Sequence, residues 1–249
     1  MRKSQLNPSV TAVMVTGKSI ERVKFARTAV TSFLEQTYPN KKLLIINTGP
    51  CDILDRERLN IEEKRLFVNN DVTLGELRNM AFDLTDSDFL IQWDDDDWYH
   101  PERIAYQVSG IASSGSSVFL NNQIRYSFER DTAIVYSNGP IHGTVLHPRK
   151  IRQRYSPLKR SEDTVFMKIL PNRVVMDNEP KMYIRFYHGS NTWDELHIMG
   201  RASHDDVKGQ RLRFDSCSPD NKIYLSKVLN DHYSWVGKLN ETKSDLPGL

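Results

Sequence analysis

Apolar and polar residues along the first half of the chain follow the periods of short strands and amphipathic helices. Residues 10–16 (VTAVMVT) form a short β-rich run, which predicts a first buried strand. The next segment carries apolar residues at steps of three and four, which predicts an amphipathic helix that Pro39 ends. Those apolar residues are Val23, Ala26, Val30, Phe33 and Leu34. Residues 43–46 predict a second buried strand, and the turn-forming run Asn47-Thr48-Gly49-Pro50 ends it.

Strand and helix patterns continue as far as residue 101. Residues 66–68 predict a short third strand. Residues 73–84 predict a helix, because Thr73 followed by Glu76 is a capping-box pattern. Residues 89–93 predict another buried strand, and Pro101 occupies a favoured first position of the next helix. This order of elements, β-α-β-β-α-β-α, predicts an α/β fold in which helices cover both faces of a mostly parallel central sheet.

The second half of the chain has a different pattern. From residue 117 to residue 146 short alternating segments predict a small set of antiparallel strands added to the sheet. Residues 161–170 predict a helix, residues 182–187 a late strand, and residues 220–236 a helix near the carboxyl end. We expect residues 241–249 to fray.

Composition places the chain among soluble globular proteins. Its 249 residues fit one large α/β domain or two small ones, and 39% hydrophobic with 27% charged residues exclude a disordered chain. The net charge of +2 indicates no particular partner. Cys51 and Cys217 make no metal-type spacing, so we expect free thiols in a reducing compartment. Because we find neither a signal-peptide pattern nor a membrane-spanning apolar run, we expect a cytoplasmic protein, with docking at the inner membrane face left open.

The strongest chemical signal is the run Asp94-Asp95-Asp96-Asp97, which follows the predicted strand 89–93 directly. Adjacent carboxylates repel one another by about 1 kcal/mol or more per close pair at a protein surface, so a compensating cation is expected. Open α/β sheets bind ligands at the carboxyl ends of their strands, where this run begins. In an extended chain Asp94 and Asp96 point to one side, so both could hold a hard divalent cation beside phosphate oxygens. The alternative is a solvated acidic loop, but the flanking Trp93 and Trp98 favour a site.

Several further motifs occur in a fixed order between about residues 10 and 195. They are residues 32–40 (SFLEQTYPN), residues 74–79 (LGELRN), residues 92–101 (QWDDDDWYHP), Gly143-Thr144 followed by Glu162-Asp163-Thr164, and residues 188–193 (HGSNTW). Together they resemble the family 2 glycosyltransferases of the GT-A fold, a Rossmann-like nucleotide-sugar fold, in the bacterial and phage branch whose acidic motif reads WDDDDWYxP. The resemblance implies an inverting hexosyl- or pentosyltransferase that uses a nucleotide-diphosphate sugar. It divides the chain into a donor-binding half (8–100), an acceptor half (101–200) and a C-terminal helical extension (201–249).

The resemblance also implies the residues of the donor site. Asp94 and Asp96 would hold a divalent metal, Mn²⁺ or Mg²⁺, with His188 reaching the same ion; the alternative for His188 is a buried, hydrogen-bonded histidine. The donor-binding residues would be Thr16, Asn47, Arg78, Asp94, Asp95 and Asp96. For Arg78 the alternative is a surface arginine. Asn47 departs from the family pattern, which has an acidic residue after the second strand, so the base of the donor stays open.

Asp163 is the candidate general base of the acceptor half. A sugar hydroxyl is a poor nucleophile until its proton is removed, and a positioned carboxylate can accelerate that step by ~10²–10⁴-fold. The alternative is that Ser161, Glu162 and Asp163 only cap a helix and complement its dipole. The other acceptor-side candidates are Trp98, Gly143, Thr144, Glu162, Arg149, Lys150 and Arg152.

Residues 147–160 (HPRKIRQRYSPLKR) form the most basic segment of the chain. Since this basic segment directly precedes Asp163, we expect it to line the acceptor side and to favour an anionic acceptor, such as a lipid-linked phosphate, a cell-wall polymer or DNA. The alternative is an ordinary solvated surface. His204-Asp205-Asp206 has metal-type residues without a partner motif, so we expect an exposed loop there.

Two other functions compete with sugar transfer. A nucleotidyltransferase also needs carboxylates, a divalent ion and a nucleotide, but the chain has no phosphate-loop motif beyond Gly17-Lys18-Ser19. A non-enzymatic module that binds a polyanion or nucleic acid would use the basic segment and would leave the aspartate run unexplained. The sequence predicts no oligomeric state.

Overall fold

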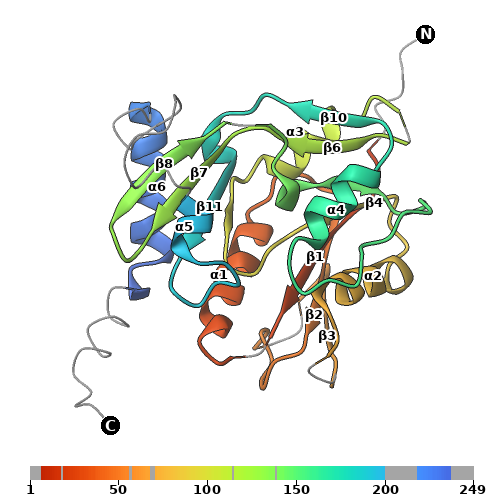
Figure 1. Cartoon of the computed structure of the whole chain (residues 1–249), viewed down its shortest axis with the longest axis horizontal. Coiled ribbons are helices and arrows are strands. Elements are labelled where there is room, and N and C mark those ends of the chain that lie inside the picture. Colours follow the sequence, from red (N-terminus) through yellow and green to blue (C-terminus); the bar gives the residue numbers. More distant parts are fainter. Residues whose placement is uncertain are drawn as a thin grey trace.

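Seven strands form one sheet through the centre of the chain, which the computed structural model describes over residues 7–17, 19–55, 58–67, 71–113, 115–137, 139–199 and 218–236 (Figure 1). The strand order is β10-β6-β9-β4-β1-β2-β3. Their bounds are β1 (Val10–Thr16), β2 (Lys41–Asn47), β3 (Ile61–Arg65), β4 (Phe89–Gln92), β6 (Ser117–Leu120), β9 (Leu146–Pro148) and β10 (Arg173–Met176). β9 runs antiparallel to β4 and β6, whereas the other neighbouring pairs are parallel.

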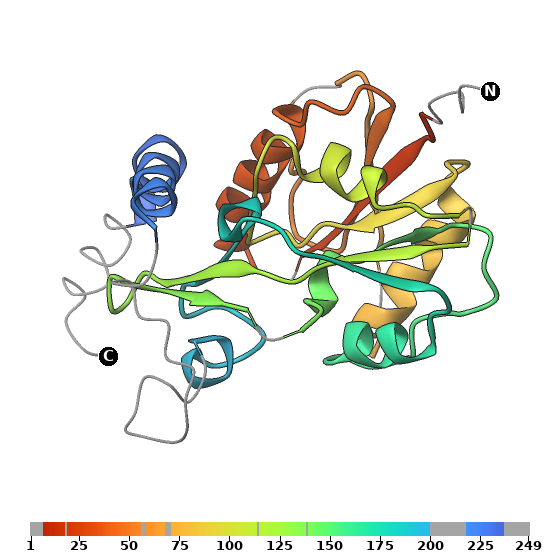
Figure 2. The ribbon, with the colours of Figure 1, turned by 90° about the horizontal axis from the view of Figure 1, so that it is seen from above.

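Helices cover both faces of this central sheet because its strands are apolar on both sides (Figure 2). Their bounds are α1 (Arg22–Leu34), α2 (Leu74–Leu84), α3 (Arg103–Ser109) and α4 (Glu162–Ile169). α1 and α3 lie on one face, and α2 and α4 lie on the other. Along β1, Met14 packs in the cluster that holds Phe33 of α1, whereas its neighbour Val13 packs in the cluster that holds Leu77 and Phe166. This arrangement confirms the predicted α/β class.

A smaller sheet stands beside the central one, with strand order β5-β11-β7-β8. Its elements are β5 (Trp98–Tyr99), β7 (Gln123–Ser127), β8 (Thr132–Tyr136) and β11 (Tyr183–Tyr187), with α5 (Glu195–Met199), α6 (Pro219–His232) and the short helices η1 (His142–Thr144) and η2 (Pro180–Met182). α6 covers one face of this smaller sheet through Leu225 and Val228, which pack with Ile184 and Phe186 (Figure 2). α5 lies over the other face, where the Ile198 carbonyl accepts from Arg125.

Most of the predicted elements are confirmed. The strands at 10–16, 43–46, 89–93 and 182–187, and the helices at 73–84, 161–170 and 220–236, match observed elements to within a few residues. The capping box is present, since the Glu76 amide donates to Thr73 Oγ1 at 3.2 Å and the Thr73 amide to Glu76 Oε2 at 2.8 Å.

Three predicted boundaries are wrong. The third strand is Ile61–Arg65 rather than 66–68, because an edge strand tolerates charged side chains and can therefore form in the charged sequence IEEKR. α1 ends at Leu34, before Pro39, where the buried Gln36 side chain donates to the carbonyls of Ser32 and His100 and so ties the chain to the loop before α3. α3 begins at Arg103, two residues after Pro101.

The prediction that residues 117–146 add antiparallel strands to the central sheet is correct only in part. β6 joins that sheet in parallel with β10, whereas β7 and β8 belong to the smaller sheet. The crossing between the two sheets is fixed by the buried amide of Asn178. Its Oδ1 accepts from the amides of Asn121 and Asn122, and its Nδ2 donates to the Asn122 carbonyl. A contact across more than fifty residues, which no local pattern shows, therefore sends the chain out of the central sheet.

Other predictions fall partly outside the described residues. Cys51 is a free cysteine, whereas Cys217, the segment 204–206 and residues 241–249 lie outside them. Within the described part of the chain, no helix is long and apolar enough to cross a membrane.

His147 of β9 makes the stability of the fold depend on pH. Its ring is buried between Phe82 and Phe166, and burial lowers the pKa of the imidazole to about 4, against ~6.5 in an unfolded chain. The unfolded chain therefore binds the proton first as pH falls, which favours unfolding. Between pH 7 and pH 5 we expect this residue to remove about 2 kcal/mol from the free energy of unfolding.

Urea unfolding of the wild type and of His147→Phe at the two pH values measures this contribution. The wild type should lose about 2 kcal/mol more than the variant between pH 7 and pH 5. Equal losses in the two proteins would show that His147 is not the titrating group.

Candidate active site

The ends of three neighbouring parallel strands bring the predicted donor residues to one edge of the central sheet. Thr16 is the last residue of β1 and pairs in register with Asn47, the last residue of β2. β4 pairs with β1 on its other side and ends at Gln92, directly before Trp93 and the aspartate run. Since parallel strands share their carboxyl edge, residues far apart in the sequence meet here.

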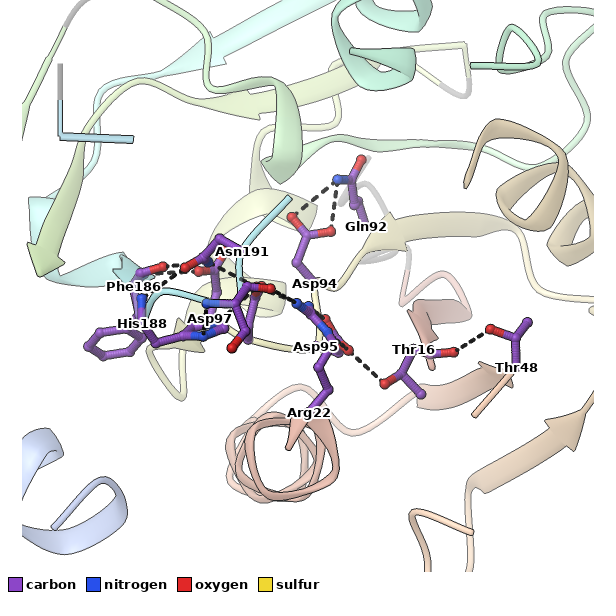
Figure 3. Close-up of polar contacts among 12 residues, drawn as sticks. Thr16, Arg22, Thr48, Gln92, Asp94, Asp95, Asp97, Phe186, His188 and Asn191 are labelled. Carbon is purple, nitrogen blue, oxygen red and sulfur yellow. Dashed lines mark hydrogen bonds and ion pairs between the residues drawn. The ribbon is translucent and has the colours of Figure 1, made fainter. Parts of the chain in front are cut away.

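The four aspartates do not alternate as an extended chain would, so that prediction is wrong. Asp94 is directed toward Gln92 and Asp95 toward Thr16 (Figure 3). The chain turns at residues 95 and 96, and both carboxylates pair with Arg22 at the start of α1. The guanidinium reaches Asp96 Oδ2 at 3.0 Å, and Thr16 Oγ1 donates to Asp95 Oδ2 at 2.6 Å. The compensating cation that the acidic run requires is therefore supplied in part by a side chain of α1.

Asp96 is the point at which donors from three segments converge. Its Oδ2 accepts from Arg22, from Asn191 Nδ2 at 3.2 Å, and lies 3.3 Å from His188 Nε2. The His188 ring stacks on Phe25 of α1 with the ring centroids 3.9 Å apart. Burial alone would raise the pKa of Asp96, but the charge of Arg22 and the hydrogen bond of His188 lower it well below the ordinary value. Asp96 is therefore held ionised.

Asp94 turns away from Arg22 and pairs with Arg78. Arg78 Nη2 lies 2.8 Å from Asp94 Oδ1, and its Nε lies 3.1 Å from Glu162 Oε1. Arg78 is buried, so the alternative of a surface arginine is wrong. Burial lowers the pKa of this guanidinium, and the charges of Asp94 and Glu162 more than offset that effect. This chain of three charged residues joins the end of β4 to the start of α4, where Asp163 follows Glu162.

Gly143 allows the backbone of η1 to approach the acidic run. A Cβ at this position would lie 3.1 Å from Asp94 Oδ2 and 3.5 Å from Gln92 Nε2. Asp97, in contrast, is fully buried, accepts from Tyr183 and from the Phe186 amide, and has a pKa that burial raises well above the ordinary value. Asp97 thus fastens β11 to the aspartate run.

Asp163 lies half-buried in the first turn of α4. Its Oδ1 accepts from the Thr164 amide at 2.6 Å, and Thr164 Oγ1 lies 2.8 Å from His142 Nδ1 of η1. Burial lowers the pKa of His142, whereas the charge of Asp163 raises it. Thr164 therefore makes the contact between α4 and η1, and Asp163, its neighbour, also binds an amide of the first turn, as the alternative of a role at the helix start supposed.

Three of the predicted site residues are occupied by contacts inside the protein. Asn47 donates to Glu63 and to the Cys51 carbonyl and accepts from Gly49. Trp98 is buried against α6, where its Nε1 donates to Tyr224, and the Thr144 side chain bridges Ile141 and Leu120. These contacts hold the loops around the site.

The basic segment does not line the acceptor side along its whole length, contrary to the prediction. Because β9 runs antiparallel to β4, Pro148 pairs with Phe89, and Arg149, Lys150 and Arg152 follow at the edge of the sheet opposite the aspartates. Arg149 is bound there to the carbonyls of Ser87 and Phe82. The end of the segment returns toward the site, where Arg160 lies over the Trp193 ring at 5.2 Å.

Sequence reasoning missed Arg22, Asn191 and His142. Arg22 could have been found, because it opens the helix after β1 and therefore lies at the same sheet edge as the aspartates. Asn191 lies inside the motif at 188–193, so its place beside His188 was visible in the sequence. His142 precedes Gly143 but gives no signal of its own.

The types of side chain at this site, carboxylates beside one imidazole, are those that suit a hard divalent cation. Among the residues that the structure describes, no three His, Cys, Asp or Glu side chains are already gathered around one point. Asp94 and Asp96 are nevertheless the most exposed aspartates of the run, with 24% and 14% of their side chains accessible, and His188 Nε2 lies 3.3 Å from Asp96 Oδ2. Carboxylate oxygens with one imidazole suit Mg²⁺ or Mn²⁺.

Comparisons with known proteins agree with this fold. Residues 19–178 match the family model described as glycosyl transferase family 2. The crystal structure of S. aureus TarS 1-349 has a TM-score of 0.56 at 16% identity, with 72% of this chain and 60% of that chain covered. A second S. aureus TarS structure has a TM-score of 0.54 at 15% identity, covering 91% of this chain but 44% of that one, so the chain spans less than two thirds of either. No curated protein matches the sequence.

Proposed function

Because the chain belongs to glycosyl transferase family 2 and has the GT-A fold, we propose that it transfers a sugar from a nucleotide-diphosphate sugar to an acceptor hydroxyl. The observation that carries this proposal is the convergence of Arg22, His188 and Asn191 on Asp96 at the carboxyl edge of the sheet. Such an edge is where open α/β sheets bind nucleotides. Membership of the WDDDDW-type branch and transfer of a hexose or pentose are parts of the same proposal.

The proposed donor site lies in residues 8–100 and the acceptor site in residues 101–200, with residues 201–249 as an extension that includes α6. The pairs Asp94–Arg78 and Arg78–Glu162 support this arrangement, since they bring Asp94 of the donor half and Glu162 of the acceptor half to one site. Thr16, Asn47 and Arg78 would position the donor together with Asp94–Asp96. Asn47 and Thr16 would act through the loops they hold, because their side chains already have partners.

A divalent ion, Mn²⁺ or Mg²⁺, would be held by Asp94 and Asp96 with His188. When bound, it would supply Lewis-acid stabilisation of the diphosphate. Arg22 pairs with both Asp95 and Asp96 and keeps Asp96 ionised, whereas burial raises the pKa of Asp95. Phe25 stacks on the His188 ring beside Asp96. These contacts prepare the carboxylates before a donor arrives.

Asp163 is the proposed general base. The acceptor hydroxyl proton passes to the Asp163 carboxylate as the acceptor oxygen forms its bond to the anomeric carbon. The bond between that carbon and the diphosphate breaks, and its electron pair leaves with the nucleoside diphosphate. Attack from the face opposite the diphosphate inverts the anomeric centre. Support comes from the position of Asp163, one residue after the Arg78 partner Glu162 and one residue before Thr164, which contacts η1.

Fewer residues lie on the acceptor side than the sequence suggested. Arg149, Lys150 and Arg152 lie at the opposite edge of the sheet, so they give no support to an anionic acceptor. Arg160, Trp193 and His197 remain near the site as a stacked group, with the Trp193 and His197 rings 4.0 Å apart. A flat aromatic and cationic surface of this kind suits a sugar ring that carries an anionic substituent. A cytoplasmic location stays part of the proposal.

Donor binding tests the proposal. A nucleotide sugar at 100 times its dissociation constant should raise the free energy of unfolding by about 2.7 kcal/mol, and only when Mn²⁺ or Mg²⁺ is present. A thermal-shift screen of nucleotide sugars with and without the metal measures this effect. Slow release of free sugar and nucleoside diphosphate should accompany binding. Release of pyrophosphate would indicate a nucleotidyltransferase, no release a binding module, and full activity in excess chelator would contradict the metal site.

A further inference from the structure

Arg185 is a half-buried cation at the centre of β11 that the proposed mechanism does not use. By strand alternation it lies on the same face of the smaller sheet as Tyr183, whose hydroxyl donates to Asp97 and would lie 3.7 Å from a Cβ on Gly143. Among the residues that the structure describes, no side chain or carbonyl forms a hydrogen bond or ion pair with Arg185. Arg22 and Arg78, in contrast, are both bound to carboxylates.

A second guanidinium lies directly beside it. Arg125 of β7 pairs in register with Arg185, so the two side chains leave neighbouring parallel strands on one face. Arg125 is satisfied by neutral groups, because it donates to the Ile198 carbonyl and stacks on the Tyr136 ring at 3.7 Å. Burial, and then the charge of Arg185, lower its pKa to about 10. Within the described residues neither arginine has a carboxylate bound to it, and two such adjacent cations disfavour each other until an anion lies between or beside them.

The surroundings place this pair between the two halves of the site. Tyr183, on the same face of β11 as Arg185, donates to Asp97 and approaches Gly143, which itself borders Asp94. Burial lowers the pKa of Arg185, but Tyr183 and the charges of Asp97, Asp94 and Asp96 raise it overall. Burial, and in addition the charge of Arg185, lower the pKa of His142 and His197, and His142 Nδ1 lies 2.8 Å from Thr164 Oγ1, next to Asp163. A group bound at Arg185 would therefore touch the space between the diphosphate carboxylates and the general base.

We propose that Arg185 binds a phosphate oxygen of a substrate, with Arg125 adding to the positive potential; this inference rests on the proposed sugar transfer for its substrate. A free guanidinium offers phosphate two parallel N–H donors, a geometry that lysine cannot reproduce. The phosphate has two sources. On the donor it is the leaving diphosphate, on which negative charge grows as the bond to the anomeric carbon breaks. On the acceptor it is a phosphate next to the attacking hydroxyl.

Calorimetric titration in buffer with Mg²⁺ tests the assignment without any transfer reaction. Inorganic pyrophosphate represents the donor diphosphate, and glycerol phosphate represents a phosphate-bearing acceptor. Arg185→Gln should weaken binding of one probe at least tenfold, which is about 1.4 kcal/mol, and Arg185→Lys should restore only part of it. Loss for pyrophosphate assigns the donor, and loss for glycerol phosphate alone assigns the acceptor. The matched control Arg173→Gln, on the exposed edge strand β10, should change neither affinity by more than about twofold.

Two results would overturn the proposal. One is equal affinity of the wild type and Arg185→Gln for both probes, and the other is a wild type that binds neither. Far-ultraviolet circular dichroism and the melting temperature of each variant establish that the fold is kept, and Arg185→Lys preserves the charge beside Arg125 if the glutamine variant unfolds. Phosphate binding that persists while nucleotide sugars are not hydrolysed would refute sugar transfer and leave the anion site in place.

Discussion

Asp96→Asn should lower the rate of sugar transfer by at least ~10³-fold, or about 4 kcal/mol of transition-state stabilisation, and should leave the protein folded. The substitution removes the negative charge on which Arg22, His188 and Asn191 converge, and with it one of the two carboxylates proposed to hold a divalent ion. Asparagine retains one acceptor oxygen, and Asp95 still pairs with Arg22, so the turn at 95–96 keeps its main contacts. Initial rates with saturating donor and Mn²⁺ measure the loss.

Asp86→Asn is the matched control for this charge change. Asp86 is exposed and pairs with Lys42 at the opposite edge of the central sheet, so its loss should change the rate by less than about twofold. Donor affinity in the presence of Mn²⁺ should fall for Asp96→Asn and not for Asp86→Asn. A variant at position 96 that keeps more than a tenth of wild-type activity would refute the proposed role of Asp96 in holding the metal.

Asp163→Asn should lower the transfer rate at least ~100-fold while donor affinity stays within about threefold of the wild type. The substitution separates the two candidate roles of this residue, which are binding the Thr164 amide at the start of α4 and accepting the proton of the acceptor hydroxyl. Asparagine can still accept from the Thr164 amide, so the first turn of α4 stays capped, but it cannot take a proton from the acceptor hydroxyl. Steady-state rates and a nucleotide titration on the same preparation measure the two effects.

A comparison with Glu162→Gln distinguishes a base from a structural acid. Glu162 is buried and ion-paired with Arg78, so its neutral variant should lower stability and donor affinity together. Asp163→Asn should instead leave the melting temperature close to that of the wild type. If donor affinity fell as far as turnover in Asp163→Asn, the carboxylate would belong to the donor site and another group would have to remove the proton.

The sequence was informative wherever a short segment carries its own structural signal. The apolar run at 10–16 and the segment 89–93 became β1 and β4, because strands buried on both faces are apolar at every position. The strand ends then placed Thr16 and the aspartate run at one edge, since parallel strands share a direction. The capping box at Thr73 and Glu76 fixed the start of α2, and thereby the position of Arg78 on it.

The strand 66–68, the alternating aspartates and the basic segment were predicted wrongly for a related reason. Each prediction treated a local pattern as if its surroundings were uniform. β3 can be charged because it lies at the edge of the sheet. The aspartate run turns, and Arg22 forms ion pairs with two of its carboxylates on one side. Sequence distance from Asp163 suggested that Arg149 is near it, but the chain traverses the sheet between them.

The sequence by itself determined the α/β class, the location of the aspartate run at a strand end, and the ordered set of motifs that resembles the family 2 glycosyltransferases. Only the tertiary structure decided which cations compensate Asp94, Asp95 and Asp96, which face of the smaller sheet carries Arg185 beside Arg125, and on which side of the sheet the basic segment begins. The physical reason is that a residue's local period fixes its strand or helix, whereas the direction of β9 and the partner of each charge depend on contacts between segments up to about a hundred residues apart, whose energies no local pattern records.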